Sequence, residues 1–96
     1  MTVTAIIYTR DNCSFCTKAK QLLRAKEIDY QERILDTNGI DDRILFENQS
    51  WVTKQDLLDL CPDAKTLPQI WVDNEYVGGY NALRDRFTKI NLGSKL

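Results

Sequence analysis

Two cysteines separated by two residues, Cys13 and Cys16, are the strongest chemical signal in the sequence. They follow an apolar run at residues 3–8 and precede an amphipathic stretch, a pattern that predicts a strand, a sharp turn and a helix. Residues three apart share one face of a helix, so the two thiols can meet in a disulfide. Unpaired N–H groups and the helix dipole favour a thiolate at the helix start. We therefore predict an exposed attacking thiol at Cys13 and a shielded resolving thiol at Cys16.

The residues around the cysteine turn modify this prediction. Arg10 adds a cation on the approach side, which favours the Cys13 thiolate, whereas Asp11 acts in the opposite direction. Phe15 stands between the two cysteines, where it can either contact a substrate or shield Cys16.

Two other uses of the cysteine pair have less support. A zinc site needs further thiolate or imidazole ligands, and the chain has no histidine and only one other cysteine, Cys61. A structural disulfide of a secreted domain is expected with a signal segment and an even number of cysteines, and we find neither pattern. The apolar pattern around Cys61 predicts a small core residue rather than a third catalytic thiol.

The composition predicts a single domain over residues 1–96, because a chain of 96 residues with 43% hydrophobic content can bury one core. A net charge of −1 gives no general attraction to nucleic acid, and no apolar run has the length of a membrane span. Three cysteines without a secretory segment favour a reducing compartment. We expect a cytoplasmic protein without nucleic-acid or membrane partners.

The remaining patterns predict an α/β domain in the order β-α-β-α-β-β-α, with helices on a four-stranded mixed sheet. Strands are expected at residues 3–8, 28–35, 69–72 and 76–77. The first two are joined by a helix, so they should be parallel with a right-handed crossover. The last two form a hairpin around residues 73–75.

The middle of the chain, residues 36–63, is expected to be an extended helical segment. Asp41 and Asp42 are in the first turn of one predicted helix, and residues 48–50 interrupt it. A second, short helix is expected to begin with a capping box formed by Thr53 and Asp56.

Two further motifs belong with the cysteine turn by their chemistry. Pro68 opens a strand, and a cis Leu67–Pro68 bond would turn the Leu67 backbone outward to pair with a thiol peptide, although few such bonds are cis. Gly78 and Gly79 precede Asn81, a predicted helix N-cap, and expose backbone amides where a carboxylate can dock. The alternative for the glycine pair is an ordinary strand-to-helix turn.

Four stretches, in the same order, resemble the dithiol glutaredoxins of phage and bacterial type: residues 7–10, the Cys-Ser-Phe-Cys turn at 13–16, residues 66–73, and residues 78–83. Residues 36–63 match poorly and look longer than in compact members. The resemblance implies a thioredoxin fold. It also implies a glutathione-dependent thiol–disulfide oxidoreductase that reduces protein disulfides and glutathione mixed disulfides.

The resemblance also implies roles for individual residues. Cys13 is the nucleophile and Cys16 the resolving thiol, while Arg10 matches the cation for the glycyl carboxylate of glutathione. The predicted glutathione site is completed by Phe15, Thr66, Leu67, Pro68, Gly79, Tyr80 and Asn81. Two positions depart from the family pattern: Ala82 stands where an acidic residue often meets the γ-glutamyl ammonium, and Ser14 replaces the commoner proline.

The implied partners are glutathione as the reductant and disulfide-containing proteins, with ribonucleotide reductase as the family's best-known partner; we expect a monomer and no required metal. Two alternative functions stay open. Serine after the first cysteine resembles glutaredoxins that share a [2Fe–2S] cluster across a glutathione-bridged dimer, with Cys13 as the only protein ligand from each chain. A thioredoxin-like reductant served by a flavin reductase would normally carry Trp before the first cysteine and Gly-Pro between the two, whereas Asn12 and Ser14-Phe15 stand here.

Overall fold

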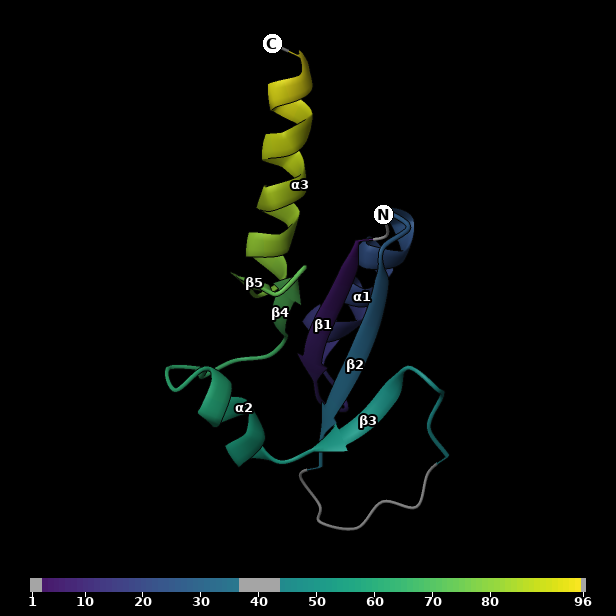
Figure 1. Cartoon of the computed structure of the whole chain (residues 1–96), viewed down its shortest axis with the longest axis vertical. Coiled ribbons are helices and arrows are strands. Elements are labelled where there is room, and N and C mark those ends of the chain that lie inside the picture. The colour runs from purple at the N-terminus through teal and green to yellow at the C-terminus, as the bar shows by residue number, and fades with distance from the viewer. Residues whose placement is uncertain (1–2, 37–43, 96) are drawn as a thin grey trace.

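Eight helices and strands make up the part of the chain that the computed structural model describes, namely residues 3–36 and 44–95, with side chains to residue 88. In chain order they are β1 (Thr4–Thr9), α1 (Ser14–Ala25), β2 (Asp29–Leu35), β3 (Gln49–Val52), α2 (Lys54–Leu60), β4 (Gln69–Val72), β5 (Glu75–Gly78) and α3 (Tyr80–Lys95) (Figure 1). Within these ranges, no helix combines the length and the apolar character that crossing a bilayer requires.

The strands form one mixed sheet in the order β3-β2-β1-β4-β5. β1 is parallel to β2 and antiparallel to β4, and β4 is antiparallel to β5. The β1-α1-β2 unit and the terminal hairpin are therefore as predicted. The hairpin turn consists of Asp73 and Asn74, both with positive φ (49° and 68°), which suits the right-handed twist of the two strands.

The sheet has five strands rather than the four that the sequence predicts. The additional strand, β3, pairs in parallel with β2 through backbone hydrogen bonds such as Glu32 N–H to Asn48 O (2.8 Å) and Asp36 N–H to Val52 O (3.0 Å). From the sequence, the polar residues 48–50 at the start of β3 are instead predicted to interrupt a helix. A four-residue edge strand buries little of either face, so it lacks the apolar alternation that marks a strand in sequence.

The middle of the chain is less helical than predicted. The expected helix start at Asp41 and Asp42 lies outside the described residues, and residues 44–46 are irregular, with Ile44 95% and Phe46 78% exposed. The second predicted helix is present as α2, and its capping box is confirmed: the Asp56 N–H donates to Thr53 Oγ1 (3.1 Å) and the Thr53 N–H to Asp56 Oδ2 (2.9 Å).

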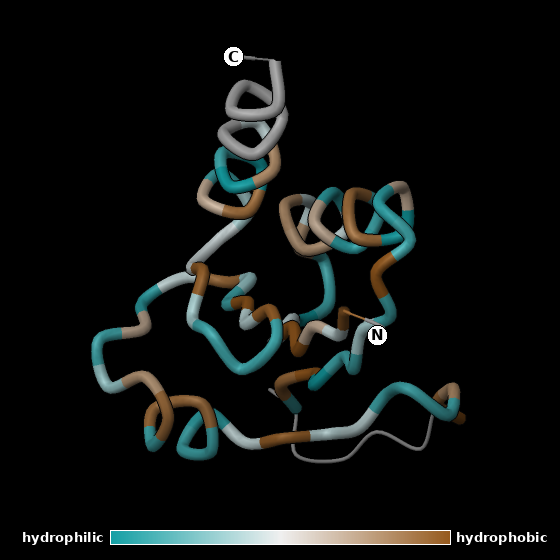
Figure 2. The backbone as a smooth tube through the Cα atoms, turned by 45° about the horizontal axis from the view of Figure 1, so that its top comes forward, coloured by the Kyte–Doolittle hydropathy of each residue, from teal (hydrophilic) through white to brown (hydrophobic). Residues whose placement is uncertain are grey.

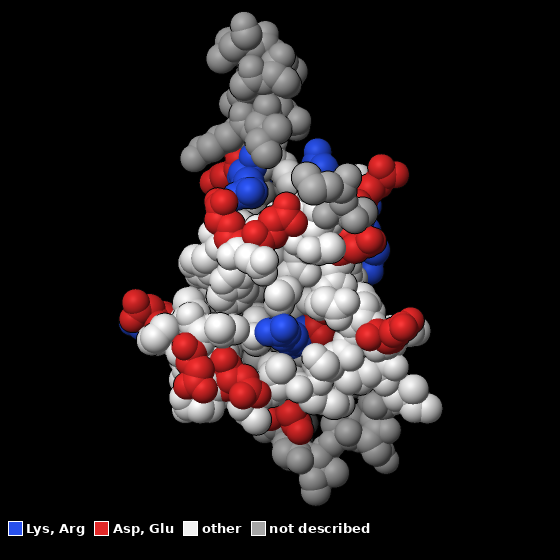
Figure 3. All heavy atoms as spheres, viewed as in Figure 1, with Lys and Arg blue, Asp and Glu red and all other residues white. Residues whose placement is uncertain are grey.

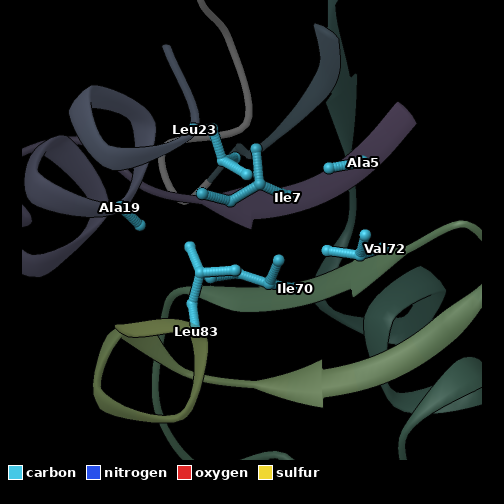
Figure 4. Packing of buried hydrophobic residues seen from close by; sticks show 7 residues of the cluster. All are labelled: Ala5, Ile7, Ala19, Leu23, Ile70, Val72 and Leu83. Carbon is cyan, nitrogen blue, oxygen red and sulfur yellow. The ribbon is translucent and has the colours of Figure 1, made fainter. Parts of the chain in front are cut away.

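The hydrophobic core lies between the sheet and helices α1 and α3, which contact each other on one face. Figure 2 shows polar and apolar positions interspersed along α1, whose buried residues are Cys16, Ala19 and Leu23. Figure 4 shows the core side chains of both helices directed at those of the two central strands: Ala5, Ile7, Ala19, Leu23, Ile70, Val72 and Leu83. Burial of this cluster fixes where both helices begin relative to β1 and β4.

A buried carboxylate, Glu32, connects three strands and a helix. One carboxylate oxygen accepts hydrogen bonds from the Thr9 hydroxyl (2.7 Å) and the Lys20 ammonium (3.0 Å), and the other accepts from Gln49 Nε2 (2.9 Å). Burial acts to raise the pKa of Glu32, but these hydrogen bonds and the Lys20 charge outweigh it and hold the pKa below its ordinary value. The carboxylate therefore stabilises the fold in its charged form.

We expect Glu32→Gln to lower the free energy of unfolding at pH 7 by about 2 kcal/mol, because charged hydrogen bonds are lost inside the protein. A lowered pKa in the folded state stabilises the fold above the glutamate pKa of about 4.3 and loses that contribution as the pH falls further. The difference between wild type and variant should therefore shrink between about pH 5 and pH 3. Urea denaturation over this range measures it, with the exposed Glu47→Gln as control. Equal effects of the two substitutions on the free energy of unfolding would contradict the stabilising role of the Glu32 carboxylate.

Candidate active site

The cysteine turn joins the end of β1 to the start of α1, as predicted. Asn12 has a positive φ of 57°, a conformation that asparagine tolerates better than most residues, and it turns the chain into the helix. Cys13 is the N-cap of α1, with extended backbone, and its Sγ accepts a hydrogen bond from the Cys16 N–H (3.2 Å). The sulfur therefore takes the position that Ser or Asp commonly occupies at a helix start.

Cys13 and Cys16 form a disulfide, with their Cα atoms 5.2 Å apart. Cys13 is half-buried, whereas only 2% of Cys16 is exposed. The difference agrees with the predicted geometry, in which an incoming reagent reaches the first sulfur before the second.

The loop before β4 lies directly against the disulfide. Its Leu67–Pro68 bond is cis, and the Leu67 carbonyl oxygen is 3.8 Å from Cys13 Sγ, although the two residues are 54 positions apart. Gln69 holds the loop, because its Nε2 donates to the Thr66 carbonyl (2.9 Å) and its Oε1 accepts from the Tyr76 hydroxyl (2.6 Å). The predicted Thr66-Leu67-Pro68 motif thus contacts Cys13 through the Leu67 carbonyl.

The start of α3 lies on the other side of this loop. A Cβ at Gly79 would be 3.5 Å from the Pro68 carbonyl oxygen, so the backbones approach closely. Contrary to the prediction, Asn81 is not the N-cap: α3 begins at Tyr80, and the Gly79 carbonyl accepts the Leu83 N–H (3.0 Å). Glycine is an acceptable N-cap residue, and a sequence scan that favours asparagine places the boundary two residues late. The Asn81 side chain is exposed.

Phe15 crosses from α1 toward α3. Its ring is 50% exposed and lies 6.1 Å, centroid to centroid, from the ring of Tyr80. These two predicted site residues therefore meet beside the disulfide, and half of the Phe15 ring remains open to a ligand.

A hollow of about 430 Å³ extends from Leu67 toward α2. Three cations border it, Arg10, Lys54 and Lys65, and its remaining lining is largely apolar, including Leu57 and Leu58. Arg10 is among the residues predicted from the sequence, whereas neither lysine is. The place of Lys65 directly before the Thr66 motif was a usable signal, whereas only the fold brings Lys54 there.

A second groove, of about 630 Å³, opens on the other side of the turn. Both cysteines line it, and so do Lys20 and the buried Glu32, which form the ion pair described above. Glu32 was not among the residues predicted from the sequence, although it shares one face of β2 with Tyr30 and Ile34, which puts its side chain on the helix-covered face. The third cysteine, Cys61, is half-buried at the end of α2, so it is less enclosed than the predicted core residue.

A protein-family model for glutaredoxin matches residues 5–77, from the first strand through the cysteine turn, the cis-proline loop and most of β5. The chain belongs to the glutaredoxin family. Its C-x-x-C pair makes this glutaredoxin a dithiol member and a thiol–disulfide oxidoreductase. It is 37% identical to glutaredoxin 1 of Rickettsia conorii over 82 residues, which cover 85% of this chain and 70% of the relative. It is 30% identical to glutaredoxin 3 of Escherichia coli over 77 residues, which cover 80% and 77% of the two chains.

Solved structures agree with this assignment. Glutaredoxin 1 from Francisella tularensis, complexed with cacodylate, superposes with a TM-score of 0.69 at 26% identity and covers 93% of this glutaredoxin and 96% of its own chain. Reduced glutaredoxin from Escherichia coli gives 0.60 at 29% identity, with 94% and 98% covered. The predicted thioredoxin fold is confirmed, with five strands in place of four.

Gly78 offers a stability test of the turn before α3. Its φ is +119°, and an added Cβ would lie 3.2 Å from Ala82 Cβ, so we expect Gly78→Ala to cost about 2 kcal/mol of unfolding free energy. Gly79→Ala is the matched control, because its Cβ would meet only an ordinary contact at 3.5 Å. Urea denaturation compares the two variants. A Gly79→Ala variant that is the less stable of the two would refute this account of the turn.

Proposed function

We propose that this glutaredoxin reduces protein disulfides and glutathione mixed disulfides, with glutathione as its reductant. The observation that carries the proposal is the disulfide at the start of α1, with the Leu67 carbonyl 3.8 Å from Cys13 Sγ. A buckwheat glutaredoxin solved as a glutathione complex has the same fold, with a TM-score of 0.66 at 19% identity over 94% of this chain and 73% of its own.

The two cysteines differ in access, and the proposed exchange follows from that difference. In the reduced protein, the Cys13 thiolate attacks one sulfur of the substrate disulfide, forms a mixed disulfide and releases the other substrate sulfur as a thiolate, which takes up a proton. The Cys16 thiol then loses its proton, attacks Cys13 Sγ and releases the second substrate thiol. Two glutathione molecules return the resulting disulfide to two thiols and become one glutathione disulfide.

The proposed glutathione site surrounds Cys13. Arg10 would hold the glycyl carboxylate at the edge of the cation-bordered hollow, and the outward backbone of Leu67 would pair with the cysteinyl segment. The start of α3 at Gly79 and Tyr80 would hold the γ-glutamyl end, with Phe15, Thr66, Pro68 and Asn81 at the border of the site. Ala82, half-buried beside Gly78, supplies no carboxylate for the γ-glutamyl ammonium.

Several expectations about the protein's setting stay predictions. A reducing compartment such as the cytoplasm suits a thiol catalyst that glutathione must regenerate. Four further expectations also remain predictions: ribonucleotide reductase as a partner, a monomeric state, a shared [2Fe–2S] cluster, and reduction by a flavin reductase. None of the contacts described above favours one of them.

Replacing each cysteine by serine tests the division of labour. Cys13→Ser should reduce turnover of every disulfide to the uncatalysed rate, because it removes the attacking sulfur. Cys16→Ser should keep activity on glutathione mixed disulfides, where a second glutathione can resolve the intermediate, and lose most activity on protein disulfides. A glutathione-coupled assay with both substrate types measures this. Cys61→Ser is the control, with an expected cost of only about 1 kcal/mol in stability. Equal inactivation by Cys13→Ser and Cys16→Ser would refute the scheme.

Charge reversal at Arg10 tests the glutathione site. Arg10→Glu should raise the KM for glutathione about fivefold, since an exposed ion pair contributes up to about 1 kcal/mol. Salt should raise the wild-type KM and have little effect in the variant, because salt screens an exposed pair. Arg24→Glu makes the same charge change on the exposed surface of α1 and serves as control. An unchanged KM in Arg10→Glu would reduce Arg10 to an ordinary surface charge.

A further inference from the structure

Four side chains from two helices form a continuous row beside the disulfide. The Lys18 ammonium lies 5.3 Å from the centre of the Phe15 ring, and that ring is 6.1 Å from the ring of Tyr80. The guanidinium carbon of Arg84 lies 6.0 Å from the centre of the Tyr80 ring. We call these residues, Lys18, Phe15, Tyr80 and Arg84, the cation–aromatic row.

The position of the row puts it in the path of a substrate. Phe15 lies between the two cysteines in the first turn of α1, and Tyr80 follows Gly79, whose backbone approaches Pro68. A polypeptide that pairs with the Leu67 backbone while its sulfur meets Cys13 would have the cation–aromatic row within reach. Phe15 is half exposed and Lys18 and Arg84 are exposed, so the row is accessible to that polypeptide.

The row is electrostatically positive. Both α1 and α3 begin here, and the positive end of each helix dipole adds to the two cations. Arg84 also contacts Asp85 at 3.9 Å, but both side chains are more than half exposed (57% and 62%), and such a pair leaves the guanidinium available to a ligand. Figure 3 shows acidic groups spread over the face drawn there, with fewer basic groups among them.

We propose that the cation–aromatic row selects protein substrates whose reactive cysteine is flanked by acidic residues. The inference rests on the proposed function and specifies its substrate class. An extended chain advances about 3.3 Å per residue, so carboxylates two or three residues from the substrate cysteine can reach Lys18 on one side and Arg84 on the other. The rings between them offer an apolar surface to the residues next to the cysteine. The exchange reaction itself is unchanged; the row affects only the encounter and the binding of the substrate.

Two synthetic substrates isolate the charge effect. Each is a five-residue peptide with a central cysteine and one glycine on either side of it. One peptide carries an aspartate at each end and the other a lysine at each end, and each is oxidised to its symmetric disulfide. The glycine spacers limit the effect of the charges on the intrinsic reactivity of the peptide cysteine. The uncatalysed reaction rate of each peptide with glutathione corrects for the effect that remains. The neutral hydroxyethyl disulfide, measured on every variant, reports general activity.

Wild type should reduce the aspartate peptide with a kcat/KM about fivefold above that of the lysine peptide at low salt, and the ratio should approach one in about 0.5 M salt. Lys18→Glu and Arg84→Glu should each lower the ratio, and the double variant should invert it. Lys26→Glu is the matched control: it makes the same charge change at the other end of α1, where the ammonium lies 5.6 Å from the Phe87 ring centre, and it should keep the wild-type ratio.

Two results would overturn the inference. The first is a wild-type kcat/KM ratio of aspartate to lysine peptide near one at low salt. The second is the same loss of preference in Lys26→Glu as in Lys18→Glu, because the net charge of the protein would then be the cause. Failure of the proposed function is visible separately, because a wild type that reduces neither hydroxyethyl disulfide nor either peptide is not a glutathione-dependent reductase.

Discussion

The antiparallel pairing of β1 with β4 is the constraint on which the site depends. Its register places Tyr8 opposite Gln69 and Ile7 opposite Ile70. β1 leads into the Cys13 turn and β4 begins directly after Pro68, so this register brings two chain segments more than fifty residues apart to within 3.8 Å, at Cys13 Sγ and the Leu67 oxygen. A slip of one residue would reverse the faces of β4, removing Ile70 and Val72 from the core and displacing the loop from the disulfide. The hydrophobic core and the active site therefore specify the same register.

The two helix starts follow from that pairing. β4 is antiparallel to both β1 and β5, so β1 and β5 run in the same direction, and the helices that follow them, α1 and α3, begin at the same end of the sheet. Ala19 and Leu23 of α1 and Leu83 of α3 belong to one core cluster. Cys13 is the N-cap of α1, and Gly79 directly precedes α3 and lies close to Pro68. The Cys16 N–H donates to Cys13 Sγ, and the positive end of the α1 dipole lies at the same place, a setting that stabilises a thiolate at Cys13.

The edge of the sheet depends on a different kind of interaction. Glu32 is buried and charged, and it accepts hydrogen bonds from β1, α1 and β3 at once. A carboxylate in this position is tolerated only because its partners outweigh the desolvation that opposes ionisation. The same Lys20–Glu32 pair lines the groove behind the cysteines, so an element that holds β3 to the sheet also borders the catalytic turn.

Local patterns in the sequence were sufficient for the strand–turn–helix around Cys13 and Cys16, the capping box at Thr53, and the β4–β5 hairpin, because each depends on neighbouring residues. Local pattern was not sufficient for β3, an edge strand defined by its hydrogen bonds to β2. It also misplaced the start of α3 at Asn81, whereas the helix begins at Tyr80 and the Gly79 carbonyl accepts its first hydrogen bond. The fold alone brought Lys54 to the hollow beside Lys65 and joined Lys18 and Phe15 of α1 to Tyr80 and Arg84 of α3 in one row. The residue types that do the chemistry are thus determined by sequence, whereas their partners across the site are decided by strand register and helix packing, which join residues that no local pattern connects.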